Sequence, residues 1–355
     1  AAYDCVGEKL SGGIVITKHG HAQGPIGSLM IREAGHPVPD DDTFSATEEA
    51  LALTQDLTEE DMVLFLLSGG GSALFEAPLV PQQELQKITQ SLLACGADIV
   101  EMNTIRKRLS AVKGGRFAQH CAPAQVCSIV LSDIIGDPLD MIASGPAYPA
   151  SSTCAEARAI AEKYDLPLSA EAAGCLERET PKTLDNVHTV ITGSVRELCS
   201  AAAEACRELG YEPVILTDSL TCEAREAGSF LAAIARSYQN TDHSLAFLAG
   251  GETVVHLTGK GKGGRNQELA LATAEGIAGL KNTAVFSVGS DGTDGPTDAA
   301  GGFVDGDTRE VLAGQGIDVL RQNDAYNALN ACGGLIVTGA TGTNVNDVAV
   351  LLIRR

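Results

Sequence analysis

The sequence contains no tryptophan, and aromatic residues make up only 4% of its 355 residues. Its formal net charge is -21, so it repels nucleic acid and offers few aromatic surfaces on which bases could stack. Its hydrophobic runs are also far shorter than the roughly 20 residues that a membrane span needs. We therefore expect neither nucleic acid nor a membrane among its partners.

Clustered cysteines and secretion signals are also lacking. The ten cysteines are scattered without a Cys-x-x-Cys pair, which excludes the usual zinc and redox motifs. No Asn-x-Ser/Thr sequon occurs, and the first residues form neither a basic leader nor an apolar signal core. These features favour a cytoplasmic location for the protein.

The length and periodicity of the chain predict two α/β domains. Helix and strand patterns alternate over residues 153–240, which is typical of a parallel sheet. The polar residues 239–242 are the best candidate for a boundary. We therefore predict an N-terminal domain at 1–240 and a smaller C-terminal α/β domain at 244–355.

Residues 259–268, Gly-Lys-Gly-Lys-Gly-Gly-Arg-Asn-Gln-Glu, concentrate positive charge in an acidic chain. A short strand-like run at 253–257 precedes them, and an apolar helix is predicted at 269–280. Free N–H groups and the positive end of a helix dipole converge at such a turn. We interpret the stretch as a site for polyphosphate or carboxylate, although a solvated glycine turn is the alternative.

Two known fingerprints resemble this stretch. Gly259, Gly261 and Gly264 match the dinucleotide pattern G-x-G-x-x-G, which is weak evidence by itself. A P-loop is excluded because Arg265 and Asn266 stand where Lys and Ser or Thr are required.

Other glycine-rich turns follow predicted strands. The apolar run 62–67 predicts a buried parallel strand that ends in Ser-Gly-Gly-Gly-Ser at 68–72, and the strand at 244–248 leads into Ala-Gly-Gly-Glu-Thr at 249–253. Ligands of open α/β sheets bind at the carboxyl ends of strands, where glycines let them approach the backbone. We expect Ser72 to be a hydrogen-bond donor there, since the residues after it lack the final glycine of a nucleophile elbow.

A second basic cluster lies in the predicted helix at 103–116. Arg106 and Lys113 are seven residues apart and share a helix face. Anion binding and a solvated helix face both remain open for them.

Acidic residues also follow strands. Asp133 ends the predicted strand 126–131, and Asp291, Asp294 and Asp298 crowd the loop after the strand 284–288. The loop does not match the calcium-binding pattern, but it holds more carboxylates than a turn needs. Three histidines, at positions 19, 21 and 36, are better interpreted as surface or core residues than as metal ligands.

Six motifs, at 68–73, 103–115, 132–146, 250–253, 259–268 and 292–300, resemble those of the class II glycerate 2-kinase family. Members carry a C-terminal domain called MOFRL, and some have been labelled hydroxypyruvate reductase. The resemblance implies a Rossmann-like N-terminal domain, an active site in an interdomain cleft, and ATP- and Mg²⁺-dependent phosphorylation of D-glycerate to 2-phosphoglycerate. Members begin with a strand and a Gly-Lys-Ala motif. Residues 1–3 resemble the family's residues next to that motif, so we expect this sequence to start just after it.

Phosphoryl transfer needs charge neutralisation and positioning more than covalent chemistry, and the motifs offer residues for both. Arg265, Asp133 and Lys113 are the predicted catalytic residues, with Arg265 on the carboxylate or the transition-state charge and Asp133 on the C2 hydroxyl. The remaining predicted site residues are Gly69, Gly70, Gly71, Ser72 and Arg106 for nucleotide phosphates, Gly251, Glu252, Gly263, Gly264 and Asn266 for substrate or phosphate, and Asp291, Asp294 and Asp298 for Mg²⁺.

The opposite assignment of ATP and glycerate to the two domains remains open. Two other functions are alternatives: an NAD(P)H-dependent hydroxypyruvate reductase using the glycines 259, 261 and 264, and a non-catalytic protein that binds small acids. A homodimer is an open alternative for the assembly.

Overall fold

The computed structural model describes residues 2–312 and 316–355, which form two compact units. The first unit comprises residues 1–130 and 138–191, and the second comprises residues 131–137 and 192–355. No helix of the described residues is long and apolar enough to cross a membrane.

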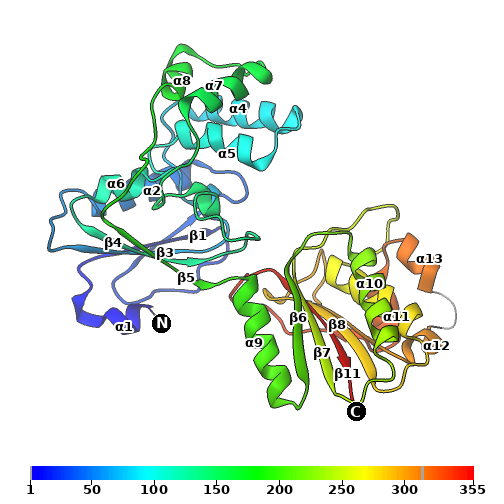
Figure 1. Cartoon of the computed structure of the whole chain (residues 1–355). Coiled ribbons are helices and arrows are strands. Elements are labelled where there is room, and N and C mark those ends of the chain that lie inside the picture. The colour runs from blue at the N-terminus through cyan, green and yellow to red at the C-terminus, as the bar shows by residue number, and fades with distance from the viewer. Residues whose placement is uncertain (1, 313–315) are drawn as a thin grey trace. The chain divides into compact units, whose positions relative to one another are not determined.

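The first unit contains two small sheets with helices around them (Figure 1). β1 and β2 pair in parallel, β3 pairs in parallel with β4, and β5 lies beside β4. The strands are β1 (Ile14–Lys18), β2 (Met30–Ala34), β3 (Met62–Leu67), β4 (Gln125–Leu131) and β5 (Val187–Gly193). The helices are α1 (Ala2–Val6), α2 (Asp41–Leu53), α3 (Gly71–Leu74), α4 (Gln82–Ala94), α5 (Ile99–Arg108), α6 (Arg116–Cys121), α7 (Cys154–Lys163) and α8 (Ala170–Leu176), with 3-10 turns at Gly7–Lys9 and Ile142–Ser144.

The strand β3 has the predicted bounds but is only half buried. It lies at the edge of its sheet, where Val63 and Phe65 pack into a core with α6 while Met62 and Leu66 remain exposed. The uninterrupted apolar run therefore does not signal burial on both faces. A separate core joins α4, α5, α7 and α8, which lie together in Figure 1.

The second unit is a six-stranded mixed sheet in the order β10-β9-β8-β11-β7-β6. β6 and β7 are parallel, whereas β11 runs antiparallel to both β7 and β8. The strands are β6 (Glu212–Leu220), β7 (Leu245–Gly251), β8 (Thr283–Gly289), β9 (Gly301–Asp305), β10 (Leu335–Ile336) and β11 (Asp347–Ile353). The helices are α9 (Val195–Glu208), α10 (Ala224–Ser237), α11 (Arg265–Ile277), α12 (Thr308–Val311), α13 (Gly316–Arg321) and α14 (Ala325–Ala331).

Helices cover both faces of this sheet (Figure 1). The second unit therefore has three layers, with the sheet between α9 and the pair α10 and α11. Side chains alternate along β7, so Ala246 and Leu248 pack against α9 while Leu245 and Phe247 pack against α10 and α11. The central strands β7 and β11 are consequently buried along almost their whole length.

The α/β fold with parallel strands in the N-terminal half agrees with the sequence-based prediction, but the units divide elsewhere. The predicted boundary at 239–242 lies inside the second unit, between α10 and β7. β5 joins β4 in the first unit, whereas β6 pairs with β7 in the second, so the strands of residues 153–240 do not share one sheet. Strand pairing over this distance is set by tertiary packing, which local periodicity does not report.

Candidate functional site

In the first unit, the buried side chain of Lys113 holds the glycine turn after β3 through hydrogen bonds. Its ammonium group lies 3.0 Å from the carbonyl oxygens of Ser72 and Phe75 and forms an ion pair with Glu76 at 3.0 Å. Lys113 and Glu76 are almost completely buried, and burial lowers the pKa of Lys113. All three ammonium protons therefore have protein acceptors, which makes Lys113 a support of the turn.

Ser72 belongs to a hydrogen-bonded chain built from three of the predicted motifs. The hydroxyl oxygens of Ser72 and Ser144 are 3.4 Å apart, and Ser144 donates to Asn103 Oδ1 at 2.8 Å. Ala143, Ser144 and Gly145 all have positive φ angles of 49–64°, a conformation that is unfavourable for residues with a Cβ. Asn103 and Ser144, which the sequence interpretation did not single out, hold the hydroxyl of Ser72 in place.

Gly70 and Gly71 are required by the shape of this turn. Gly70 has a φ of 86°, and a Cβ on Gly71 would lie 2.7 Å from the Cβ of Ala143. Gly69 is exposed in the same turn. Gly71 thus lets the turn pack against the loop of Ser144, and Gly70 supplies the left-handed backbone that the turn needs.

The side chain of Arg106 has no hydrogen-bond or ion-pair partner in residues 2–312 and 316–355. Its charge contributes to the lowered pKa of Lys113, so the two cations of the predicted pair influence each other. A partly exposed guanidinium without a partner is free to bind an anion, unlike the ammonium of Lys113.

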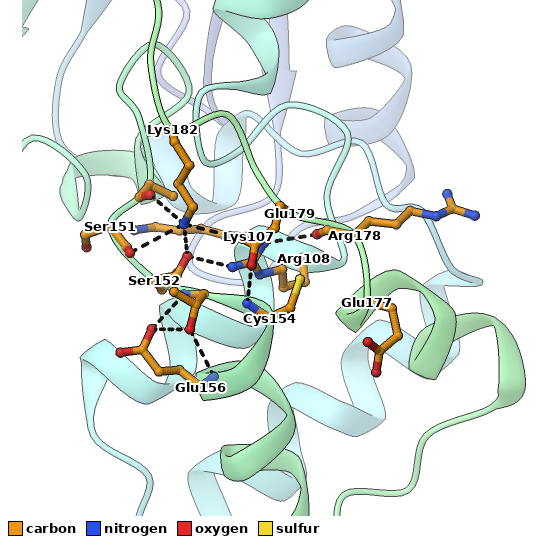
Figure 2. Close-up of polar contacts among 12 residues, drawn as sticks. Lys107, Arg108, Ser151, Ser152, Cys154, Glu156, Glu177, Arg178, Glu179 and Lys182 are labelled. Atoms are coloured by element: carbon orange, nitrogen blue, oxygen red, sulfur yellow. Dashed lines mark hydrogen bonds and ion pairs between the residues drawn. The ribbon is translucent and has the colours of Figure 1, made fainter.

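The neighbouring cations have structural partners (Figure 2). Lys107 forms an ion pair with Asp140 at 3.1 Å, and Arg108 binds Glu179 at 3.0 Å and the carbonyl oxygen of Ser152 at 2.6 Å. Both cationic side chains are at most 2% exposed. In the basic cluster at 103–116, Lys107, Arg108 and Lys113 therefore form internal ion pairs, whereas the side chain of Arg106 has no partner among the described residues.

In the second unit, predicted site residues meet where β7 and β8 end and β11 begins. The register pairs Asp347 with Gly251 on one side and with Gly289 on the other. Arg265, at the start of α11, binds Asp347 through Nε at 2.5 Å and Nη2 at 3.2 Å, and binds Glu252 through Nη1 at 2.9 Å. We call Asp133, Glu252, Arg265, Asn346 and Asp347 the strand-end cluster.

Asn346 connects Asp133 to this cluster. Its Nδ2 group donates to the carbonyl oxygen of Asp133 at 3.0 Å and lies 3.4 Å from Glu252 Oε2. The carboxylate of Asp133 accepts no hydrogen bond from the side chain of any described residue, and burial raises its pKa. The cluster thus contains an available carboxylate that favours the proton more than an ordinary aspartate does.

The sequence interpretation missed Asn346 and Asp347. The last site residue that it names is Asp298. The signal was present, because a polar pair directly before the buried run 348–353 marks a strand entrance.

The glycine stretch 259–264 does not form the open anion cradle that we expected. The N–H groups of Gly259, Gly261 and Lys262 donate to Asn323, Gln322 and Asp324, respectively. A Cβ on Gly259 or Gly261 would also overlap the backbone of residues 322–324. These glycines serve close packing between two loops, and residues 253–257 form no regular strand before them.

The start of α11 is occupied by Asp294. Its two carboxylate oxygens accept the N–H groups of Asn266 at 3.1 Å and Gln267 at 2.8 Å. Asp294 is 2% exposed, and burial raises its pKa to about 6. The positive end of this helix therefore interacts with an internal carboxylate.

Several residues that were predicted to contact the substrate are instead packed against other parts of the protein. Asn266 is 1% exposed and accepts from Ser287 Oγ at 2.6 Å, and the cavity beside it, of about 10 Å³, holds no more than one water. A Cβ on Gly264 would lie 2.3 Å from the Asp294 carboxylate, and one on Gly251 would lie 2.2 Å from the carbonyl oxygen of Leu220. Gly263 packs against Ala325.

The three aspartates predicted for Mg²⁺ are engaged separately. Asp291 accepts hydrogen bonds from Thr293, Asp294 caps α11, and Asp298 accepts from the hydroxyl of Tyr326 at 2.7 Å. Within the described part of the chain, these three carboxylates do not converge on one metal position. Local turn and cap geometry, which cannot be seen in a count of acids, explains their separation.

Comparisons with known proteins cover almost the whole chain. Residues 1–177 match the family described as "Domain of unknown function (DUF4147)", and residues 245–347 match the MOFRL family. D-glycerate 2-kinase of Thermotoga maritima is 51% identical over 362 residues, covering 99% of this chain and 87% of the relative. A protein of Agrobacterium vitis with the provisional name hydroxypyruvate reductase is 41% identical, covering 96% of this chain and 81% of its own length.

Solved structures agree with these matches. The crystal structure of glycerate kinase from Thermotoga maritima has a TM-score of 0.97 at 50% identity, covering 99% of this chain and 87% of that chain. A protein from Pyrococcus horikoshii has a TM-score of 0.90 at 38% identity, with coverages of 97% and 83%.

Proposed function

This chain belongs to the glycerate 2-kinase family, and we propose that it transfers the γ-phosphoryl group of ATP to the C2 hydroxyl of D-glycerate. The observation that carries the proposal is the 51% identity to D-glycerate 2-kinase of Thermotoga maritima along 99% of the chain. The strand-end cluster and the glycine turn with Ser72 supply residues for the chemistry.

Asp133 is the proposed acceptor for the proton of the C2 hydroxyl. Its carboxylate is available, and its raised pKa brings its proton affinity closer to neutral pH. The C2 hydroxyl becomes a better nucleophile as its proton moves to Asp133, while the phosphoryl group takes the place of that proton on oxygen.

Arg265 is the proposed ligand for the carboxylate of glycerate or for the charge that develops on the moving phosphoryl group. Asp347 and Glu252 fix its planar guanidinium, and the side chain remains 34% exposed, so outward N–H donors can still bind an oxyanion. Preorganisation by two carboxylates means that little reorganisation accompanies the reaction.

The turn of Gly69, Gly70, Gly71 and Ser72 is proposed to bind the nucleotide phosphates together with Arg106. The supporting observation is that the guanidinium of Arg106 has no partner in the described residues, whereas the three ammonium protons of Lys113 all have acceptors. Lys113 is then a positioning residue, in place of the catalytic role predicted from the sequence.

Mg²⁺ is proposed as the cofactor, held by one or two carboxylates and by the ATP phosphates. Asp291 is the member of the predicted set that fits, because it is partly exposed and, among the described residues, its carboxylate oxygens accept hydrogen bonds only from Thr293. When bound, Mg²⁺ would neutralise phosphate charge. Asp294 does not fit, since both of its oxygens cap α11.

A ³¹P NMR spectrum of the product formed from ATP and D-glycerate tests this function directly. We expect a phosphate monoester on C2, with one ADP released for each product. A monoester on C3, or ADP release without a new monoester, would contradict the proposed transfer.

The name of the Agrobacterium vitis relative makes hydroxypyruvate reduction the second candidate. The structure disfavours it, because the N–H groups of Gly259 and Gly261 bind neighbouring loops, whereas a dinucleotide site directs such groups at a pyrophosphate. Oxidation of NADH or NADPH by hydroxypyruvate, measured by absorbance, would support this alternative.

A further inference from the structure

Three metal-ligating side chains meet on the first unit, at the edge where β1 ends. His19 follows β1 directly, and its N–H group donates to the carbonyl oxygen of Ala34 at the end of the parallel strand β2. Asp40 is the N-cap of α2, and Asp42 lies in the first turn of that helix. The loop from β2 to α2 is short, so the start of α2 lies close to the end of β1.

The three ligand atoms have spacings that suit one ion. His19 Nε2 lies 2.8 Å from Asp40 Oδ2 and 3.8 Å from Asp42 Oδ2, and all three atoms lie within 4.8 Å of one another. Ligand atoms at about 2.1 Å from a common metal ion are roughly 3–3.4 Å apart in octahedral or tetrahedral geometry. Movements of at most about 1.5 Å between these atoms complete such an arrangement, which rotation of the exposed side chains of His19 and Asp42 can supply.

Asp40 is oriented for this task. Its Oδ1 atom accepts the N–H groups of Gly35 at 3.0 Å and Thr43 at 2.9 Å, and also the hydroxyl of Thr43 at 3.0 Å. Its Oδ2 atom has His19 as its hydrogen-bond partner among the described residues. Outer hydrogen bonds of this kind fix a ligating carboxylate before the metal arrives.

We propose that His19, Asp40 and Asp42 bind a divalent first-row transition-metal ion, for which Mn²⁺ serves as the spectroscopic probe. One imidazole and two carboxylates form a mixed nitrogen and oxygen donor set, which such ions accept more readily than the purely oxygen-preferring Mg²⁺. The side chains of His19 and Asp42 are 51% and 69% exposed, so waters can fill the remaining coordination positions. Two carboxylates balance the ion's charge while the imidazole remains neutral.

The chain contains a matched pair that lacks the third ligand. His243 Nδ1 lies 2.7 Å from Glu212 Oε1, and both side chains are exposed. Because no third His, Cys, Asp or Glu of the described residues joins them, this pair should bind a metal ion more weakly than the triad does. The pair is therefore a control for the metal affinity of an exposed histidine and carboxylate without a third ligand.

The test is a titration of chelator-treated protein with Mn²⁺ alone, without nucleotide or glycerate, followed by electron paramagnetic resonance. We expect one ion per chain, with nitrogen hyperfine modulation in the pulsed spectrum from the imidazole. His19→Ala should weaken binding about tenfold or more and remove the nitrogen signal, and Asp42→Asn should weaken binding while the nitrogen signal remains. His243→Ala should leave both measurements unchanged.

Both decisive substitutions change exposed side chains, so the fold should persist, and circular dichroism checks this. Binding that is lost in His243→Ala but kept in His19→Ala would overturn the proposal. So would the absence of bound Mn²⁺ in the wild type at millimolar metal. Because the titration contains no substrate, its outcome is independent of the proposed kinase activity.

Discussion

Replacing Lys113 by methionine separates its structural role from the catalytic role that the sequence suggested. Methionine has a similar length and can occupy the buried channel, but it cannot donate hydrogen bonds. The change leaves Glu76 as an unpaired buried carboxylate and removes the donor from the carbonyl oxygens of Ser72 and Phe75. The substitution thus removes the hydrogen bonds that hold the backbone of the glycine turn.

The expected cost is about 3–5 kcal/mol, the range for breaking one side of a buried ion pair. For a unit of this size, each kcal/mol lowers the melting temperature by roughly 2–4 °C, so the variant should melt roughly 6–20 °C lower. Replacing Glu76 by glutamine in the same chain removes the stranded charge. The double variant Lys113→Met/Glu76→Gln should therefore recover a large part of the loss.

Differential scanning calorimetry together with the kinase assay gives the answer. The matched control is Arg106→Gln on the helix α5, where no described partner is lost, so stability should change by no more than about 0.5 kcal/mol. This control should raise the KM for ATP by roughly tenfold or more, since a hydrogen bond to a charged group contributes about 1.5–3 kcal/mol. If Lys113→Met melts like the wild type but has lost its turnover, the ammonium acts on the ligand and our structural interpretation is refuted.

Three further predictions concern the second unit. Arg265→Ala should lower kcat by about 100-fold or more, as expected for loss of a charge-stabilising donor, and near-normal turnover would remove Arg265 from the mechanism. Asp133→Asn should lower kcat by about 100-fold or more and leave the KM for ATP nearly unchanged, since a general base contributes to the chemical step; an equal effect on binding would contradict this role. Because the pKa of Asp294 is raised from 3.8 to about 6, the folded state holds its proton more tightly than the unfolded state, so stability should fall by up to roughly 3 kcal/mol as the pH rises from about 4 to 7. Asp294→Asn should remove that component, which urea melts of both proteins across this pH range measure as a difference; parallel stability curves would contradict the raised pKa.

The sequence predicts the elements well because their signals are local. The run 62–67 matches β3, and the pattern at 126–131 matches β4 to within one residue. Strand order depends on contacts between distant residues, and for that reason the compact units divide near residue 191 rather than at 239–242. The antiparallel pairing of β11 with both β7 and β8 has no counterpart in local periodicity.

Several predicted site residues lie together where strands end, although their roles in the reaction stay predictions. Asp133, Glu252 and Arg265 come from three motifs that are far apart in the chain, and Asn346 and Asp347 join them at one sheet edge. The strand-end rule is sufficient for this result because it depends only on where the buried runs stop.

Prediction from composition failed where backbone groups decide the outcome. The glycines at 259–264 indicate open N–H groups in the sequence, yet Asn323 and Asp324, about 60 residues later, accept the hydrogen bonds of Gly259 and Lys262. Every buried N–H group needs an acceptor, and the structure supplies it from within the protein before any ligand is considered. A helix start therefore indicates an anion site only when no internal carboxylate, such as Asp294 here, already caps it. Positive charge in a glycine-rich stretch is consequently weaker evidence for phosphate binding than a single unpaired cation such as Arg106, because the charge of the stretch is distributed over side chains whose backbone already has partners.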